Sequence, residues 1–288
     1  MELVWLEDFN ALVESENFSR AAELRHVTQP AFSRRIRALE SWVGVDLFER
    51  TTQGATLTEA GLSMLDNARE LTRRLHQMRA DVQEVAGKAV RTLHFAATHS
   101  LSFTFFPGWI RAVENGAPLE GISLHSDNMA ACEQLLLGGQ VQFLICHQHP
   151  GVPPRFDTTR FDSKVIGSDT LQALQSPELV LDERIPFLAY TAESGLGRIV
   201  ASHLQAQLDP PKMDTVFSSH LAAVLLSMAL QAKGVAWLPD SLAATELAAG
   251  RLVRARVALP DIATDIRIFR PRMPLGTVAE GFWSSLVV

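Results

Sequence analysis

The chain has 288 residues, with 26 Lys or Arg against 32 Asp or Glu, which makes its formal net charge −6. This length is too great for one small module and suits two or three compact units. Apolar residues make up 47% of the chain and charged residues 20%, so a sizeable core can form and wholesale disorder is excluded. The negative net charge, taken alone, argues against a nucleic-acid binder.

Three features of the sequence concern its location. The most apolar stretch, residues 221–230, spans only about ten residues, which is too short for a transmembrane helix. The N-terminus lacks the basic and apolar regions of a secretory signal. Two cysteines, Cys132 and Cys146, cannot build a disulfide framework and fit a reducing compartment. We therefore expect a cytoplasmic protein with no membrane partner.

The charge is unevenly distributed along the chain. Residues 1–60 hold six basic and ten acidic side chains, for a net charge of −4. Within them, residues 25–37 contain no acid and four arginines: Arg25, Arg34, Arg35 and Arg37. One acid-free arginine cluster in an acidic segment favours a local contact over a generally adhesive surface.

The spacing of apolar residues predicts three helices around this cluster. The first covers roughly residues 3–15, and Asn17 or Ser19 can cap a second, shorter helix. The third starts at Thr28 and has Pro30 in its first turn, where a missing N–H costs little. One face of the third helix is apolar and the other is polar and basic. This is the layout of a helix-turn-helix, although arginine-rich helix faces are more often simply solvated.

The segment after the third helix predicts a small wing. Residues 44–57 alternate loosely in polarity around a Gln-Gly turn, as in a hairpin. The runs that carry a family resemblance are residues 17–22, 27–40, 44–50 and 57–61. Over these runs the sequence resembles the winged helix-turn-helix of LysR-type transcriptional regulators, almost continuously through the first 65 residues.

The helix-turn-helix layout and this resemblance predict seven residues that bind a double-stranded DNA operator. The residues expected to hold phosphates or approach the backbone are Thr28, Ser33, Arg37 and Arg50, the last from the wing. The residues expected to face base edges in the major groove are Gln29, Pro30 and Arg34.

A long helix is predicted next. Residues 58–86 contain no proline, and from Ala68 to Val85 their apolar residues recur at steps of three and four between charged residues. The narrow apolar stripe favours a helix that pairs with the same helix of a second chain. The alternative is an amphipathic helix that packs on its own domain. The resemblance implies the same role, and a two-fold dimer would bind an inverted repeat. We expect a homodimer or homotetramer.

The remainder of the chain has a β-α-β-α-β rhythm that recurs after roughly 90 residues, which predicts a mainly parallel sheet covered by helices. The expected fold is α/β: a winged helix-turn-helix, a long linker helix, and a periplasmic-binding-protein-like effector domain of two α/β half-domains, as the resemblance also implies. The expected boundaries are 1–60 for DNA binding, 61–88 for the linker and 89–288 for the effector domain. Half-domain I is expected at about 89–160 and 267–288, and half-domain II at about 161–266.

The strand-to-helix junctions predict a pocket between the two half-domains. Ligands of open α/β sheets bind beyond the carboxyl ends of the strands, often with an anionic group at a helix N-terminus. The predicted effector-binding residues are Thr98, His99, Ser100, Asn128, Met129, His147, Ser194, Ser218 and His220. Their hydroxyl and N–H donors suit a small carboxylate, with Ser100 the strongest candidate. The alternative for any one of them is a plain helix cap. Related regulators often have a second hydroxyl side chain at the position that Met129 occupies in this chain. The resemblance therefore does not carry over a complete carboxylate site.

No sequence feature indicates catalysis. His147 and His149 lack a third metal ligand at a recognisable spacing, and Gly195-Leu196-Gly197 lacks the rest of a dinucleotide fingerprint. No nucleophile elbow or other catalytic motif is present. We expect no metal, no cofactor and no enzymatic activity.

Two alternatives to a ligand-controlled regulator stay open. Within the family, residues 34–40 and 96–102 look nearest to hypochlorite-responsive regulators, which are thought to sense oxidant through methionines. The first alternative is therefore a regulator that responds to Met or Cys oxidation, although Leu196 and Leu221 stand where sensor residues are expected. The second alternative is a stand-alone solute-binding protein.

Overall fold

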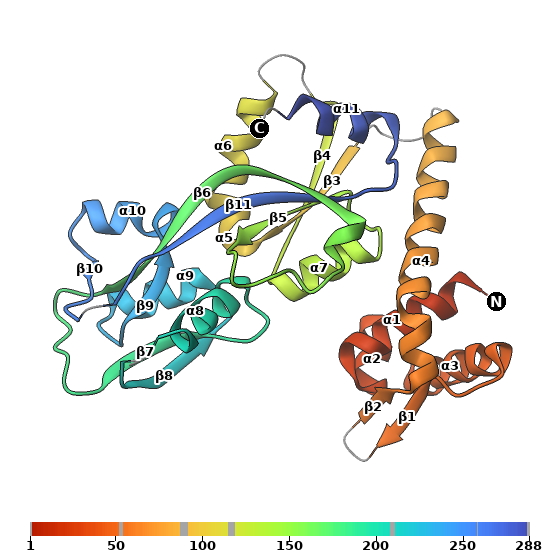
Figure 1. Ribbon diagram of the computed structural model, residues 1–288, viewed down its shortest axis with the longest axis horizontal. Coiled ribbons are helices and arrows are strands. Elements are labelled where there is room, and N and C mark those ends of the chain that lie inside the picture. The colour runs from red at the N-terminus through yellow and green to blue at the C-terminus, as the bar shows by residue number, and fades with distance from the viewer. Residues whose placement is uncertain are drawn as a thin grey trace. The chain divides into compact units, whose positions relative to one another are not determined.

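The computed structural model describes residues 2–51, 54–86, 92–114, 119–207, 211–257 and 259–286. The chain divides into two units (Figure 1). The first unit comprises Met1–Lys88 with Leu137–Gln140, and the second comprises Ala89–Leu136 with Val141–Val288. None of the helices in the described ranges is long and apolar enough to cross a membrane.

The three predicted helices begin the first unit as α1 (Leu3–Ser15), α2 (Phe18–Leu24) and α3 (Gln29–Val43). Asn17, and not Ser19, caps α2: its side chain accepts hydrogen bonds from the N–H groups of Ser19 at 2.9 Å and Arg20 at 3.1 Å. Helix α3 ends at Gly44, whose φ of +89° suits a residue without Cβ. The core side chains with no exposed surface include Leu6, Phe9, Leu12, Phe32, Ile36 and Leu39.

The predicted wing and long helix complete this unit. Strands β1 (Phe48–Thr51) and β2 (Gly54–Leu57) pair antiparallel, and α4 spans Glu59–Val85. At the start of α4, a Cβ on Gly61 would overlap the carbonyl oxygen of Leu47. Only glycine therefore allows α4 to approach the wing this closely.

The second unit begins with a parallel sheet. Strand β3 (Thr92–Thr98) lies between β4 (Gly121–Asp127) and β5 (Phe143–Gln148) and runs parallel to both. The helices of this half are α5 (His99–Thr104), α6 (Phe106–Val113), α7 (Met129–Leu137) and α11 (Thr277–Ser285). Phe105 separates α5 from α6.

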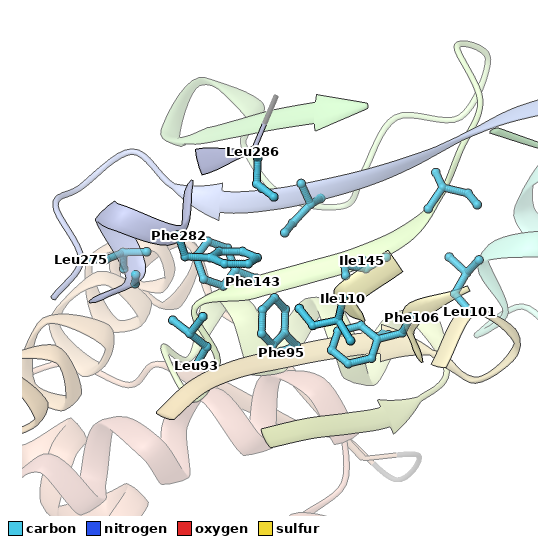
Figure 2. Close-up of a cluster of buried hydrophobic side chains, with 14 residues drawn as sticks. Leu93, Phe95, Leu101, Phe106, Ile110, Phe143, Ile145, Leu275, Phe282 and Leu286 are labelled. Atoms are coloured by element: carbon cyan, nitrogen blue, oxygen red, sulfur yellow. The ribbon is translucent and has the colours of Figure 1, made fainter. Parts of the chain in front are cut away.

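Aromatic rings fill the core of this half. Figure 2 shows Phe95 of β3 beside Phe143 of β5, and their ring centroids are 5.2 Å apart. Phe282 from α11 meets the Phe95 ring edge-on at 5.4 Å. The last helix thus returns to cover the first strand of this half, so residues from the two ends of the unit share one core.

The second half has its own core. Strands β7 (Ile185–Tyr190) and β8 (Met213–Ser219) are parallel, and β9 (Ala236–Pro239) lies next to β7, since the Leu188 N–H donates to the Val235 carbonyl at 2.9 Å. Its remaining elements are α8 (Gly195–Gln205), α9 (Ala222–Leu230), α10 (Asp240–Ala248) and β10 (Val253–Arg254). Trp237 is fully buried among them.

Two long strands join the halves. After a short 3-10 turn at Thr158–Arg160, β6 (Phe161–Gln175) pairs antiparallel with β11 (Ile262–Pro271), and both run the length of the unit (Figure 1). Strand β11 pairs with β5, whereas the far end of β6 pairs with β9 and β10. The prediction of a mainly parallel sheet is therefore wrong. The sheet is mixed because these two antiparallel strands link the two βα repeats.

Candidate DNA-binding surface and effector pocket

Six of the seven predicted DNA-binding side chains are exposed on the first unit. They are Thr28, Gln29, Pro30, Arg34, Arg37 and Arg50. The hydroxyl of Thr28 makes no capping bond to α3. An exposed row of this kind along a helix start and an adjoining wing presents donors to a nucleic-acid backbone and to base edges.

The seventh residue, Ser33, is only 3% exposed. Its hydroxyl accepts hydrogen bonds from Nη2 of Arg37 at 3.4 Å and from Nη2 of Arg50 at 3.3 Å. The Arg50 guanidinium also lies 4.5 Å from the centre of the Phe18 ring. The buried hydroxyl thus brings one arginine of α3 and one of the wing together.

The other two arginines of the acid-free cluster are held inside the unit. Asp8 of α1 has no exposed surface and accepts hydrogen bonds from Nε of Arg25 at 2.8 Å and Nη1 of Arg35 at 3.4 Å. Arg25 also pairs with Glu7. Because a buried carboxylate needs charged donors, these arginines fasten the end of α2 and the middle of α3 to α1. Arg34 and Arg37 remain for an external partner.

The second unit contains a pocket where the ends of β3, β4 and β5 meet the starts of α8 and α9. Its lining residues are Thr98, His99, Ser100, Asp127, Asn128, Met129, His147, Ser194, Gly195, Leu196, His220 and Ala222. Eight of the nine predicted effector-binding residues are therefore brought together. The cavity volume is about 20 Å³. This volume suits a small ligand or one functional group of a larger ligand.

Ser218 is the predicted residue that does not line this pocket. Strand β8 continues through Ser219, and the Ser218 side chain is exposed. Asp127 is a lining residue that the prediction omitted. Its neighbours at the end of β4 were predicted, and the same junction argument applies to its carboxylate.

Two of the pocket histidines face each other. The ring centroids of His99 and His220 are 5.7 Å apart. His99 Nδ1 lies 3.1 Å from the Ser126 hydroxyl, and its Nε2 lies 4.0 Å from Asp127 Oδ1. Burial lowers the pKa of His99, and nearby His220 lowers it further against the opposing effect of Asp127. His99 is therefore uncharged at neutral pH.

The third histidine, His147, is bonded to a buried carboxylate. Its side chain is 2% exposed, and Nε2 lies 3.1 Å from Oδ2 of Asp169 on β6. Asp169 also accepts from the hydroxyl of Ser241 at 2.6 Å and from its N–H at 3.2 Å. Burial alone would raise the pKa of Asp169, but the hydrogen bonds from His147 and Ser241 outweigh burial and hold it below its usual value. Asp169 escaped prediction because strand β6 was not recognised.

Several polar groups near this pocket are already bonded within the chain. The lining residues include no Lys or Arg. In the first turn of α7, the Ala130 N–H donates to the Glu193 carbonyl and the Ala131 N–H to the Asn128 side chain. At the start of α8, the Gly197 N–H donates to the Ser194 hydroxyl. These N–H groups already have partners within the chain.

A buried ion pair ties α7 to α8 beside the pocket. Glu133 accepts two hydrogen bonds of 2.9 Å from Nη1 and Nη2 of Arg198 and one of 3.0 Å from the Arg155 N–H. The side chains are 3% and 11% exposed. Because α7 follows a strand of the first half and α8 a strand of the second, this pair fastens the two halves.

The two cysteines are poor redox centres. Cys132 and Cys146 are free and fully buried. Burial raises the pKa of Cys132 to about 12 and also raises that of Cys146. Since the thiolate is the form that reacts with oxidants, neither position favours a cysteine switch.

The described residues contain no cluster of three or more His, Cys, Asp or Glu that could hold a metal ion. Ser241, Asp169 and His147 do not form a nucleophilic triad, because the hydroxyl bonds to the carboxylate and not to the imidazole.

The fold and the two candidate sites define a class of protein: a DNA-binding regulator with a sensory domain. The first unit is a winged helix-turn-helix with exposed arginines, and the second is a two-part α/β unit with a pocket.

Comparison with known proteins gives the family. A model described as the bacterial regulatory helix-turn-helix protein of the lysR family matches residues 3–62, and one described as the LysR substrate binding domain matches residues 86–287. The chain belongs to the family of LysR-type transcriptional regulators. As a member of this family it has a DNA-binding helix-turn-helix and an effector-binding domain.

Three relatives match over nearly their whole length. The transcriptional regulator YjiE of Escherichia coli K12 is 32% identical over 298 residues, which cover 99% of this chain and 94% of the relative. Among solved structures, Vibrio fischeri DarR in complex with DNA is 27% identical, with a TM-score of 0.55 and coverage of 99% and 97%. Full-length HypT of Salmonella typhimurium, a hypochlorite-specific LysR-type regulator, is 29% identical, with a TM-score of 0.58 and the same coverage. HypT is thus a distant structural neighbour, and these relatives are regulators, not enzymes.

Proposed function

We propose that this regulator binds an inverted-repeat operator as a homodimer or as a tetramer built from such dimers. The seven residues predicted from the sequence would form the contact, with Ser33 acting through Arg37 and Arg50. The same proposal divides the chain into a DNA-binding domain (1–60), a linker helix (61–88) and an effector domain (89–288). These components would act in the cytoplasm, where the DNA lies.

The observation that supports a dimer is an apolar stripe on α4 that its own chain leaves uncovered. Its most exposed members are Leu71, Met78 and Val82, with exposed fractions of 42%, 56% and 63%. Val85, the last residue of the predicted repeat, has a side chain outside the described set. An apolar stripe at heptad spacing is buried when two such helices pair.

We further propose that a small effector binds in the pocket of the second unit. The eight predicted residues gathered there support this site, and the two halves that surround it are joined by the crossing strands β6 and β11. An effector with different affinities for two arrangements of these halves would shift their populations and so change how the DNA-binding heads are presented. The buried, protonated cysteines do not favour the oxidant-responsive alternative.

Substitution of Arg34 tests the DNA-binding proposal. Arg34→Ala removes an exposed base-facing side chain and should cost about 1–3 kcal/mol of specific operator binding, measured by titration at fixed salt. Arg184→Ala is the matched control, because it removes one positive charge from a position of 64% exposure on the second unit. Genomic footprinting of the wild type supplies the operator. Equal operator affinity of the Arg34 variant and the wild type would refute the assignment of the recognition helix.

A further inference from the structure

The four arginines of the acid-free cluster fall into two pairs. Arg34 and Arg37 are exposed on α3, and neither forms an ion pair within the described part of the chain. Arg25 and Arg35 instead bond to the carboxylate of Asp8 on α1, and their side chains are only 27% and 35% exposed. Of the positive charge that the sequence concentrates in this cluster, half is therefore neutralised from inside the unit.

Asp8 is the only acid that pairs with Arg35 in the described ranges. Its Oδ2 accepts from Nη1 of Arg35 at 3.4 Å. Arg25, by contrast, bonds both to Oδ1 of Asp8 at 2.8 Å and to Glu7. Asp8 has no exposed surface, so water cannot replace it as a partner at this place. If the carboxylate is lost, Arg25 keeps an acidic partner and Arg35 keeps none.

A guanidinium without an acidic partner is available to phosphates. Arg35 directly follows Arg34 on the proposed recognition helix, and its long side chain already reaches solvent. A phosphate contact carries no sequence information, so an additional one strengthens binding to any DNA and steepens the salt dependence of that binding. Pairing with Asp8 removes from α3 a charge that would favour non-specific DNA.

We propose that Asp8 is a positioning residue for operator recognition, which holds Arg35 against α1 and away from phosphates so that α3 reads DNA through Arg34 and Arg37. This inference rests on the proposed DNA-binding surface and adds a residue that does not touch DNA. The same carboxylate joins α1 to the end of α2 through Arg25, so it also fixes the frame on which α3 lies. Loss of this acid lowers sequence specificity, although removal of a negative charge ordinarily favours DNA binding.

The first test compares two arginines of α3 by titrating the full-length protein with the operator duplex at several salt concentrations. Arg37→Gln removes a guanidinium assigned to the DNA backbone and should make the slope of log affinity against log salt shallower by about 0.9. Arg35→Gln removes the same charge from the same helix and should leave the slope unchanged, because Arg35 makes no phosphate contact. A shallower slope for Arg35→Gln would overturn the proposal.

The second test measures specificity as the ratio of the affinities for the operator duplex and for a random duplex of equal length. Asp8→Asn takes the ion pair from Arg35, so affinity for the random duplex should rise, its salt slope should steepen by about 0.9, and the ratio should fall. Glu23→Gln is the matched control, because it removes one acid from an exposed position of the same unit and should leave the ratio unchanged. The double variant Asp8→Asn, Arg35→Gln should regain the wild-type slope, because the released guanidinium is gone.

A ratio that falls no further in Asp8→Asn than in Glu23→Gln would overturn the proposal. A uniform loss of affinity for both duplexes would also overturn it, since that is the result expected if Asp8 only stabilised the fold. If Asp8→Asn does not fold, the salt slope of Arg35→Gln decides. An unchanged slope for Arg37→Gln, or absence of operator binding by the wild type, refutes the DNA contacts of the proposed function and not the pairing of Asp8 with Arg35.

Discussion

Removal of Glu133 is the most demanding test of how the two halves of the effector domain are held together. Glu133→Ala breaks the two 2.9 Å bonds to Arg198 and the 3.0 Å bond from the Arg155 N–H. Arg198, with a side chain 11% exposed, then stays buried without its carboxylate. Its Nε already lacks a hydrogen-bond partner in the described structure, so the pair supplies its main compensation. Loss of one partner of a buried pair costs about 3–5 kcal/mol.

The measurement is urea unfolding of the full-length protein, followed by tryptophan fluorescence. The transition of the second unit, which contains Trp109, Trp237 and Trp283, should move to lower urea with an unchanged m-value. Asp214→Ala is the control, because it breaks a 2.7 Å pair with Arg184 whose side chains are 49% and 64% exposed, a kind worth about 0–1 kcal/mol. A loss for Glu133→Ala no larger than the loss for this control would refute the reasoning.

Three further predictions follow from single sites. Gly61→Ala should destabilise the first unit by about 1–3 kcal/mol in thermal unfolding, because the new Cβ overlaps the Leu47 carbonyl; an unchanged melting temperature would contradict this packing. The lowered pKa of Asp169 stabilises the fold above the unfolded carboxyl pKa of about 3.9, and this contribution is lost as pH falls through the lower folded value. Wild-type stability should therefore fall more steeply below about pH 4 than that of Asp169→Asn, and parallel pH profiles would argue against it. Ser100→Ala, at a position 6% exposed, should weaken the effector response in a reporter assay and leave operator binding intact; an unchanged response would remove Ser100 from the site.

Two sets of buried polar contacts hold the effector domain together. Asp169 connects His147 of the pocket to Ser241 at the start of α10, and Glu133 connects α7 to α8. The first link includes His147, which lines the pocket, and the second includes Arg198, two residues after the lining residue Leu196.

The sequence by itself determined the elements whose signals are local. Helical spacing placed α1 at residues 3–15, and loosely alternating polarity around a Gln-Gly turn placed the wing. Eight of the nine residues predicted to bind an effector are among the twelve that line the pocket. Each of these signals lies within a few residues along the chain, where side-chain periodicity, caps and turn residues act directly on the backbone.

Only the tertiary structure decided the matters that depend on partners distant in sequence. Whether an arginine of the basic cluster is available to DNA depends on Asp8, which lies 17 residues before Arg25 and 27 before Arg35. The chemistry of His147 likewise depends on Asp169, on strand β6. Composition and spacing record which side chains exist, but burial and distance across the fold determine which of them are already paired. That pairing leaves the Arg34 side chain exposed and Nδ1 of His147 without a hydrogen-bond partner in the described structure.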